Sequence, residues 1–388
     1  MARTKNPEIK ERDIQGLKYF KRIVPLLEGL HLCGTQRDLA GNRQLHYDQY
    51  AGLLLIYFFS PVVTSLRSIQ RASALEKVQK LLGCSRVSLG SLSEAAHVFD
   101  PALLKQIIGE LSLEAQPLAE AKDWKALEGL TAVDGTLLPA LPKMAWALWV
   151  DEKNRAAKAH VAFEVMKGVP VDVRVTEGNG SEKGQLRLML EAGRLYVVDR
   201  GYAEYELFQE ILDAGSSVIG RIRANAVWKV IEERQVSAEA KAQGVQRDLV
   251  VRLGGEASCK AFKQPMRVVE VHVPDERSRG KVEVLLLVTD RMDLTPELVA
   301  LGYKFRWTIE LFFRWFKRIL GCMHLLSELR QGVEIQVYVA IIASLLLSIW
   351  TGRKPTKATL EMFSFYLSGW ATEQELMAHL ESLKKLAK

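Results

Sequence analysis

The sequence predicts an α/β protein that has a helical N-terminal domain, a mixed β-sheet, a β-rich insertion and C-terminal helices. Three observations lead to this class. Apolar residues recur at helical spacing up to about Leu113, the period then changes to that of strands, and a long helical pattern follows from about Pro296. With 388 residues, 48% of them hydrophobic, the chain can bury a sizeable core and form two or three domains.

The N-terminal segment is predicted to be all helical. Its first helix is indicated by apolar residues at three-residue steps: Ile14, Leu17, Phe20 and Ile23. Two helix starts are predicted further on, since Ser91 with Glu94 forms a capping-box pattern and Asp100 precedes Pro101. The stretch from Ser68 to Phe99 has the pattern of a DNA-binding helix-turn-helix, although any small helical bundle would have the same pattern.

The middle of the chain has the pattern of a mixed sheet. Strand-like runs occupy residues 129–138, 157–166, 169–176, 194–198 and 217–223. Helical segments at 182–191 and 202–214 separate the last three of them. Three consecutive strands, then helix, strand, helix and strand, is the order of an RNase H-like mixed sheet, although other mixed sheets share it.

The strand pattern continues from residue 225 to 296 in WKVIE, DLVVRL, MRVVEVHV and VEVLLLVTD, which predicts a separate β-rich insertion. One long helix is predicted next, from about Pro296 or Leu301 to Leu320, and further apolar helices follow it. The predicted domains are therefore 1–125, 126–224, 225–296 and 297–388.

Charge and cysteine content limit the classes of function. A count of 53 Lys+Arg against 46 Asp+Glu gives a net charge of +7, which favours nucleic acid as the partner ahead of an anionic membrane surface. No CxxC pair occurs, so neither a disulfide framework nor a structural zinc site is indicated for Cys33, Cys84, Cys259 and Cys322.

We expect a cytoplasmic protein without a membrane span. The charged N-terminus has no apolar segment behind it and is therefore not a secretory signal. Apolar runs at 51–63 and 337–350 are each shorter than the ~20 residues that cross a bilayer. Buried helices are the better interpretation of both runs.

Two aspartates each end an apolar strand. Asp134 is followed by Gly135 in TAVDGT, and Asp199 is followed by Gly201 two residues later in VVDRGY. Carboxylates at the ends of neighbouring parallel strands would make a plausible metal site. A single aspartate at a strand end more often caps the next turn or helix, so this pattern alone leaves both interpretations open.

A stripe of charged residues follows in the predicted long helix. Tyr303, Arg306, Glu310 and Lys317 are separated by three, four and seven residues, and at about 100° per residue they lie within an arc of roughly 60°. Arg314 belongs to the same face. An ordinary amphipathic helix with ion pairs between Glu310 and its neighbouring arginines would explain these charges. It would not explain why this stripe follows two aspartates at predicted strand ends in a basic protein.

A metal site accounts for all three stretches together. Mg²⁺ prefers carboxylate oxygens and water, and two such ions can activate an attacking oxygen and stabilise the leaving oxygen of a phosphodiester. Asp134, Asp199 and Glu310 provide three carboxylates for this purpose. The two arginines and the lysine of the stripe would hold the phosphates beside this acidic site.

The three stretches resemble the IS-four family of bacterial insertion-sequence transposases. The signature Y-x2-R-x3-E-x6-K of that family is matched at every position by Tyr303, Arg306, Glu310 and Lys317. Its motif D-x-G-[YF] is matched by Asp199, Gly201 and Tyr202, and its motif D-G-[ST] by Asp134, Gly135 and Thr136. The resemblance covers about residues 131 to 317.

The resemblance implies a DNA transposase with an RNase H-like catalytic domain that the insertion interrupts. Asp134, Asp199 and Glu310 would bind Mg²⁺ or Mn²⁺ and catalyse cleavage at the terminal inverted repeats. The freed 3′-hydroxyl would attack the opposite strand to form a hairpin, which is reopened before strand transfer into target DNA. The N-terminal domain would recognise the transposon ends, and a homodimer would act in trans on paired ends of this bacterial element.

Further residues are expected to contact DNA or to have structural roles. DNA contacts near the cut are expected from Tyr303, Arg306, Arg314 and Lys317. In relatives of this type a tryptophan of the insertion stacks on a flipped base, and Trp228, the only tryptophan of this insertion, is the candidate unless it belongs to the core. Structural roles are expected for His97, His160 and His324.

Three other functions compete with this interpretation. An RNase H-like nuclease, or a domesticated relative, would cut DNA without joining it. A basic DNA-binding protein would keep the fold without catalysis. A glycosidase is the most distant alternative, because a pair of catalytic carboxylates in a sugar cleft has no use for three cations beside the acid.

Overall fold

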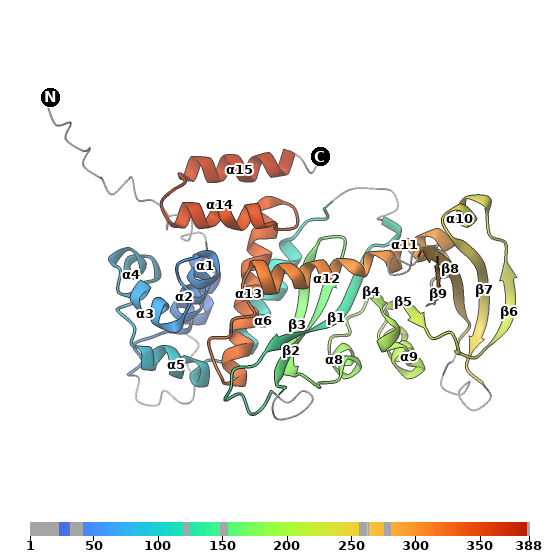
Figure 1. Ribbon diagram of the computed structural model, residues 1–388, viewed down its shortest axis with the longest axis horizontal. Coiled ribbons are helices and arrows are strands. Elements are labelled where there is room, and N and C mark those ends of the chain that lie inside the picture. The colour runs from blue at the N-terminus through green and yellow to red at the C-terminus, as the bar shows by residue number, and fades with distance from the viewer. Residues whose placement is uncertain are drawn as a thin grey trace. The chain divides into compact units, whose positions relative to one another are not determined.

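The computed structural model describes residues 23–31, 42–118, 125–147, 154–255, 262, 264–274 and 281–385. The protein is mixed α/β, as the sequence predicts (Figure 1). It divides into a first unit of residues 1–116, 138–157 and 314–388 and a second unit of residues 117–137 and 158–313. The predicted first helix, except for Ile23, and the cysteines Cys33 and Cys259 lie outside the described residues.

The first unit is helical. Its N-terminal part contains α1 (Val24–His31), α2 (Tyr47–Phe59), α3 (Leu66–Ser73), α4 (Glu76–Leu82), α5 (Leu89–Val98) and α6 (Ala102–Glu114). Its C-terminal part contains the π-helical turn η4 (Trp315–Ile319), α13 (Arg330–Thr351), α14 (Lys357–Leu367) and α15 (Glu373–Lys385). Helix α13 packs against α2 and α6, so helices that the sequence placed in different domains share one core.

Helix α13 holds this core together because apolar side chains occur all around it. Among the helices that the structure describes, it alone is long and apolar enough to cross a membrane, but 89% of its most apolar window is buried inside the protein. Helix α2 is buried over almost its whole length as well. The prediction of buried helices is confirmed for the run at 337–350 and for 51–59 of the run at 51–63, because α2 ends at Phe59 and Val62 beyond it is 75% exposed.

The two helix starts predicted in this unit have different outcomes. Asp100 Oδ1 accepts a hydrogen bond from the Ala102 N–H at 2.9 Å at the start of α6, as predicted. The predicted cap at Ser91 is wrong, because Ser88 Oγ accepts the Ser91 N–H at 2.9 Å and α5 starts at Leu89. The earlier of two serines took the capping role.

The second unit is built on a sheet with the strand order β3-β2-β1-β4-β5-β9-β8-β7-β6. Its strands are β1 (Leu130–Pro139), β2 (Ala156–Glu164), β3 (Val169–Glu177), β4 (Leu195–Val198), β5 (Ser217–Ile222), β6 (Trp228–Arg234), β7 (Val245–Leu253), β8 (Met266–Pro274) and β9 (Val282–Thr289). Strand β4 pairs in parallel with both β1 and β5, and the strands from β5 through β9, β8 and β7 to β6 pair antiparallel.

The predicted β-rich segment at 225–296 does contain strands, but these do not form a separate sheet. Strand β9 pairs with β5 from Ile219↔Thr289 to Ile222↔Leu286, so the four later strands continue the first five. The alternation of residues predicts strands but not which strands pair. It therefore could not show that β9 pairs with the edge of β5.

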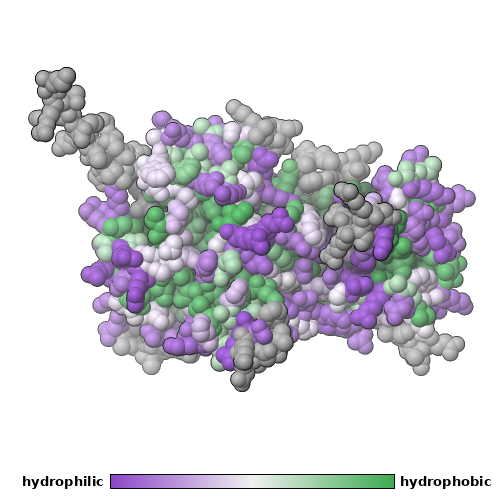
Figure 2. All heavy atoms as spheres, viewed as in Figure 1, coloured by the Kyte–Doolittle hydropathy of each residue, from purple (hydrophilic) through white to green (hydrophobic). Residues whose placement is uncertain are grey.

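Helices connect and cover the sheet in the second unit. Their bounds are α8 (Glu182–Leu188), η3 (Arg200–Tyr202), α9 (Tyr205–Asp213), α10 (Ala238–Ala242), α11 (Pro296–Phe305) and α12 (Trp307–Arg314). A buried cluster that includes Tyr196, Phe208, Ile211 and Val218 joins α9 to the strands. On the face of the molecule in Figure 2, hydrophilic residues are widely spread with hydrophobic ones between them.

Candidate active site

The register of two parallel strands brings the predicted aspartates together. Strand β1 pairs with β4 at Leu130↔Leu195 and Ala132↔Val197. The same register carried two residues further sets Asp134 opposite Asp199, and neighbouring strands lie only ~4.8 Å apart. Both side chains are partly buried.

The prediction that both aspartates end a strand holds for Asp199 only. Asp199 follows β4 and caps η3, whereas Asp134 lies within β1, which continues to Pro139, so the prediction for Asp134 is wrong. Asp134 Oδ1 accepts the Gly135 N–H at 2.8 Å, and Asp199 Oδ1 accepts the Gly201 N–H at 2.7 Å. A Cβ at position 201 would lie 2.9 Å from Asp199 Oδ1, so a glycine is needed for this close approach. The capping role that the sequence left open is therefore present at Asp199 and not at Asp134, and the printed bonds use one oxygen of each carboxylate.

The signature stripe does not lie on one unbroken helix, so that prediction is wrong. The Arg306 N–H bonds to the Tyr303 carbonyl at 3.0 Å, and the Arg306 carbonyl accepts from the Ile309 N–H at 3.2 Å. These three-residue hydrogen bonds tighten the chain between α11 and α12. Thr308 Oγ1 also donates to the Phe305 carbonyl at 2.8 Å, which draws that carbonyl into a side-chain bond.

Close packing holds α11 and α12 on the sheet. Gly302 lets α11 approach β5, because a Cβ there would lie 2.8 Å from Ile219 Cδ1. The ring centroids of Phe312 in α12 and Phe163 in β2 are 5.1 Å apart. The signature residues up to Glu310 are thereby fixed in the same unit as the two aspartates.

Arg306 connects the predicted acids. Its Nη2 lies 3.3 Å from Glu310 Oε1 and its Nη1 lies 3.8 Å from Asp134 Oδ2. Its Cζ lies 6.0 Å from the centroid of the Tyr303 ring, within reach of a cation–π contact. The side chain is only 15% exposed. Tyr303, Arg306 and Glu310 therefore gather beside the β1 aspartate.

The site carries more negative charge than its cations neutralise. Burial raises the pKa of Asp134 to about 6; the Gly135 N–H and Arg306 lower it, while Glu182 and Asp199 raise it further. An acid with such a pKa is costly to ionise without a nearby cation. The acidic group thus has the electrostatics of a cation-binding site.

The donor set suits a hard divalent cation, because it consists of carboxylate oxygens on rigid elements. As the side chains stand, no three His, Cys, Asp or Glu residues in the described parts of the chain lie close enough to hold a metal ion. Glu310 is bonded to Arg306 instead. Binding of a metal ion by all three predicted ligands therefore requires their side chains to move closer together.

The remaining predicted residues belong to other elements. Arg314 ends α12 and is exposed, and Lys317 lies in η4, where burial and then Arg318 lower its pKa; both belong to the first unit. Trp228 begins β6 and is partly buried against the core cluster of the second unit.

The histidines are consistent with structural roles. His160 is buried, and its Nε2 hydrogen-bonds to Thr176 Oγ1 at 2.8 Å. The carbonyl of His324 accepts bonds from Gln336 Nε2 at 2.7 Å and from Tyr57 at 3.3 Å. His97 is exposed on α5.

Sequence reasoning missed charged neighbours of the acids. Glu182 at the start of α8 acts on the pKa of Asp134, and Lys158 Nζ lies 3.2 Å from Glu182 Oε1. Arg221 in β5 lowers the pKa of Tyr303, which burial raises, and its Nη2 donates to Glu283 Oε1 at 2.7 Å. None of these lies in a recognisable motif, and the only signal for Glu182 was its position before the second aspartate-bearing strand.

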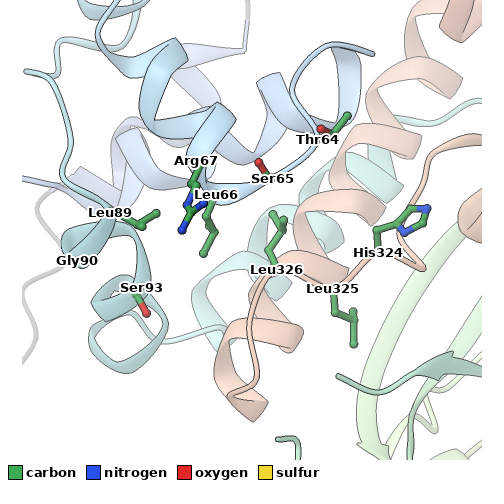
Figure 3. Close-up of a pocket in the computed structure, with 10 residues that line it drawn as sticks. All are labelled: Thr64, Ser65, Leu66, Arg67, Leu89, Gly90, Ser93, His324, Leu325 and Leu326. Atoms are coloured by element: carbon green, nitrogen blue, oxygen red, sulfur yellow. The ribbon is translucent and has the colours of Figure 1, made fainter. Parts of the chain in front are cut away.

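A hollow of about 680 Å³ lies in the first unit, not among the acids (Figure 3). Its walls come from the first turns of α3 and α5 and from the segment before α13, and they include Arg67, Ser93, His324 and Leu326. Its lining combines apolar and hydroxyl side chains with one arginine and one histidine and includes no carboxylate, so it differs from the acidic site.

Residues 125–346 match the family described as the transposase DDE domain. This match includes both aspartates and the whole signature stripe. The chain belongs to the DDE-domain transposases. Membership in that family agrees with the resemblance to insertion-sequence transposases that the three sequence stretches carry.

Several relatives are similar to this DDE-domain chain. A Sinorhizobium fredii protein named as a transposase is 31% identical over 222 residues, which are 57% of this chain and 60% of the relative. A Geobacillus stearothermophilus protein named for insertion sequence element IS5377 is 24% identical over 74% of each chain. A Synechocystis protein named for element IS4SA is 20% identical over 78% of this chain and 82% of its own.

Among solved structures, a piggyBac transposase synaptic complex with hairpin DNA is similar to 98% of this chain and 87% of that chain. The TM-score is 0.45 and the sequence identity is 10%. This score is too low to establish a shared fold.

Proposed function

We propose that this chain is a DNA transposase that cuts phosphodiester bonds at the ends of an insertion sequence and joins the freed 3′-hydroxyl to target DNA. One observation carries the proposal. Arg306 lies within ion-pair distance of Glu310, one helical turn further along the chain, and of Asp134, which is far away in the sequence, and the strand register puts Asp199 beside Asp134. Membership in the DDE-domain family gives this acidic group its reaction class.

The catalytic core is proposed to be RNase H-like, with residues 225–296 as an insertion between the second aspartate and Glu310. The order β3-β2-β1-β4-β5 supports this proposal, because the two aspartates come from its adjacent central strands. We propose that the domains end at residues 125, 224 and 296, as predicted from the sequence.

Asp134, Asp199 and Glu310 are the residues that would hold divalent metal ions, Mg²⁺ or Mn²⁺. When bound, such ions would lower the pKa of an attacking water and stabilise the charge on the leaving oxygen. The carboxylates would orient the reacting groups, and Arg306, once released from Glu310, would hold a phosphate oxygen through its forked donors.

Other contacts with DNA are proposed for Tyr303, Arg314 and Lys317 along the backbone near the cut. The aromatic ring of Trp228 is proposed to stack on a base during hairpin formation, which its partial exposure at the start of β6 permits. The N-terminal helices would bind the terminal inverted repeats, and two copies would act on paired ends in the bacterial cytoplasm.

The test is an assay with purified protein and labelled DNA that carries the terminal inverted repeats and a target plasmid. With Mg²⁺ we expect cut ends and joined products, and with EDTA neither. The variant Asp199→Asn should bind the ends but produce no cut, whereas the control Asp293→Asn, at an exposed aspartate paired with Arg291, should cut normally.

The products also discriminate the rival functions. Hydrolysis without joined product would favour a nuclease, and binding without any cleavage would favour a DNA-binding protein that keeps the fold. Either result would overturn the transposase proposal.

A further inference from the structure

Glu182 is a carboxylate beside the site that belongs to none of the recognised motifs. It occupies the first turn of α8, whose N-terminus is capped by Ser181 Oγ accepting from Gly184 N at 3.1 Å. A Cβ built on Gly135 would lie 3.1 Å from Glu182 Oε1. The Glu182 carboxylate therefore reaches the residue directly after Asp134.

The same space is shared by the two aspartates. Both Glu182 and Asp199 raise the pKa of Asp134. Burial raises the pKa of Tyr202, and Asp134, Glu182 and Asp199, in that order, raise it further. The strand register and the approach of Glu182 to Gly135 place these three carboxylates near one another, with Lys158 and Arg306 as positive charges beside them, but as the side chains stand they are not close enough together to hold a metal ion.

The hydroxyl of Tyr202 is an independent sign that something binds at this point. The side chain is 1% exposed, and its oxygen has no hydrogen-bond partner among the described residues. Buried hydroxyl groups nearly always have a partner, because leaving one unpaired is costly. An absent ligand among the three carboxylates would supply that partner.

We propose that Glu182 is a fourth carboxylate of the active site, which binds the divalent cation together with Asp134 and Asp199 while the Tyr202 hydroxyl bonds to the bound group. This inference rests on the proposed function. In the structure Glu182 is bonded to Lys158 at 3.2 Å, so its side chain must turn away from that lysine. Its 36% exposure leaves room for this rotation. Lys158 is then the counterion of Glu182 while no cation is bound.

Mn²⁺ binding to the full-length chain without DNA tests this assignment, with free Mn²⁺ followed by electron paramagnetic resonance. Glu182→Gln should weaken binding about tenfold or more, the size expected for losing a ligand or its close support. Lys158→Met should not weaken binding and should tighten it, because the competing ammonium is gone. Glu206→Gln, at an exposed glutamate in the first turn of α9, should bind like wild type.

Thermal unfolding without metal shows whether each variant is folded, and the Mn²⁺-dependent rise in Tm gives a second readout. Equal Mn²⁺ affinity of wild type and Glu182→Gln, with binding lost in Asp199→Asn, would overturn the role of Glu182 but leave the proposed function standing. If Glu182→Gln does not fold, Lys158→Met decides, and unchanged or weaker binding overturns the assignment. Absence of Mn²⁺ binding to wild type would overturn both proposals.

Discussion

Two arginine–carboxylate clusters in the second unit differ in how completely their charges are paired. Arg267 and Asp248 are 1% and 3% exposed and form a two-pronged pair, with Nε–Oδ1 and Nη2–Oδ2 both at 2.7 Å. Arg267 also donates to the carbonyls of Arg291 and Leu294. Arg306, in contrast, is shared between Glu310 at 3.3 Å and Asp134 at 3.8 Å.

This difference in pairing distinguishes the Arg267–Asp248 pair, which has a structural role, from the Arg306 cluster, which is proposed to be reactive. A buried pair tolerates its desolvation when its geometry is good and further hydrogen bonds satisfy its polar atoms, as the two bonds to Asp248 and the two to backbone carbonyls do around Arg267. Near Arg306, one cation is shared between two acids, and burial raises the pKa of Asp134 to about 6 even though Arg306 lowers it. Carboxylates that remain incompletely paired are the ones available to a metal ion and a substrate.

The largest effect is expected at Asp199. Asp199→Asn should lower the rate of DNA cleavage about 10³-fold, because metal-assisted charge stabilisation contributes several kcal/mol. The melting temperature should change little, since an asparagine still accepts the Gly201 N–H. Single-turnover cleavage of an inverted-repeat substrate measures the rate. A variant that cuts within tenfold of wild type would remove Asp199 from the reactive cluster.

A large loss of stability rather than activity is expected in the other cluster. Asp248→Ala leaves the buried Arg267 guanidinium without its carboxylate, which should destabilise the fold by about 3–5 kcal/mol. Urea denaturation with and without the substitution measures this change. The matched control is Glu233→Ala, because Glu233 and Arg247 form an exposed pair at 3.2 Å, and it should cost less than about 1 kcal/mol. Similar losses in both variants would contradict the contrast in pairing.

Because the pKa of Asp134 is raised, removing its charge should increase the free energy of unfolding by an amount that depends on pH. The native carboxyl holds its proton up to about pH 6, whereas the unfolded one loses it near 3.8, so wild-type stability falls between these values and stays lower above them. In metal-free buffer, Asp134→Asn should therefore be more stable than wild type at pH 8, by on the order of 2 kcal/mol, and equally stable at pH 3.

Denaturation curves at several pH values measure this gain. Asp293→Asn is the opposite control, because Arg291 lowers the pKa of Asp293 and the substitution should slightly destabilise the protein at pH 8. If Asp134→Asn is more stable than wild type by the same amount at every pH, the charge of the Asp134 carboxylate is not the cause of the added stability.

The smallest effect is expected for Arg306→Lys. Lysine keeps the charge but lacks the fork that reaches Glu310 and Asp134 together. We expect stability to change by less than about 1 kcal/mol, as for partly exposed pairs, while DNA cleavage falls about tenfold. A loss of several kcal/mol would mean that Arg306 is a structural cation like Arg267.

The sequence was sufficient to find the parts of the site that lie in local patterns. At Asp199 the apolar strand, the turn after it and the acid were all predictable, whereas Asp134 was found as an acid in an apolar strand that continues beyond it to Pro139. Each of the first five strands was predicted to within two residues. The buried helices α2 and α13 followed from their apolar composition.

The features that sequence could not provide depend on contacts between distant residues. The break at Arg306 depends on a side-chain bond of Thr308 and on tightened backbone bonds, which helical periodicity does not report. The pairing of β9 with β5 depends on an edge that both strands share. Glu182 reaches Asp134 only because α8 starts beside β1, so no spacing rule would have included it.

The central claim is that the carboxylates around Arg306 hold a divalent cation. A crystal of the full chain grown with Mn²⁺ and measured at the manganese absorption edge tests this claim most directly. We predict an anomalous peak within about 2.2 Å of oxygens of Asp134 and Asp199, with Glu310 no longer bonded to Arg306. Cation binding by these carboxylates is contradicted if no peak appears there, or if manganese binds elsewhere while Arg306 keeps its contact with Glu310.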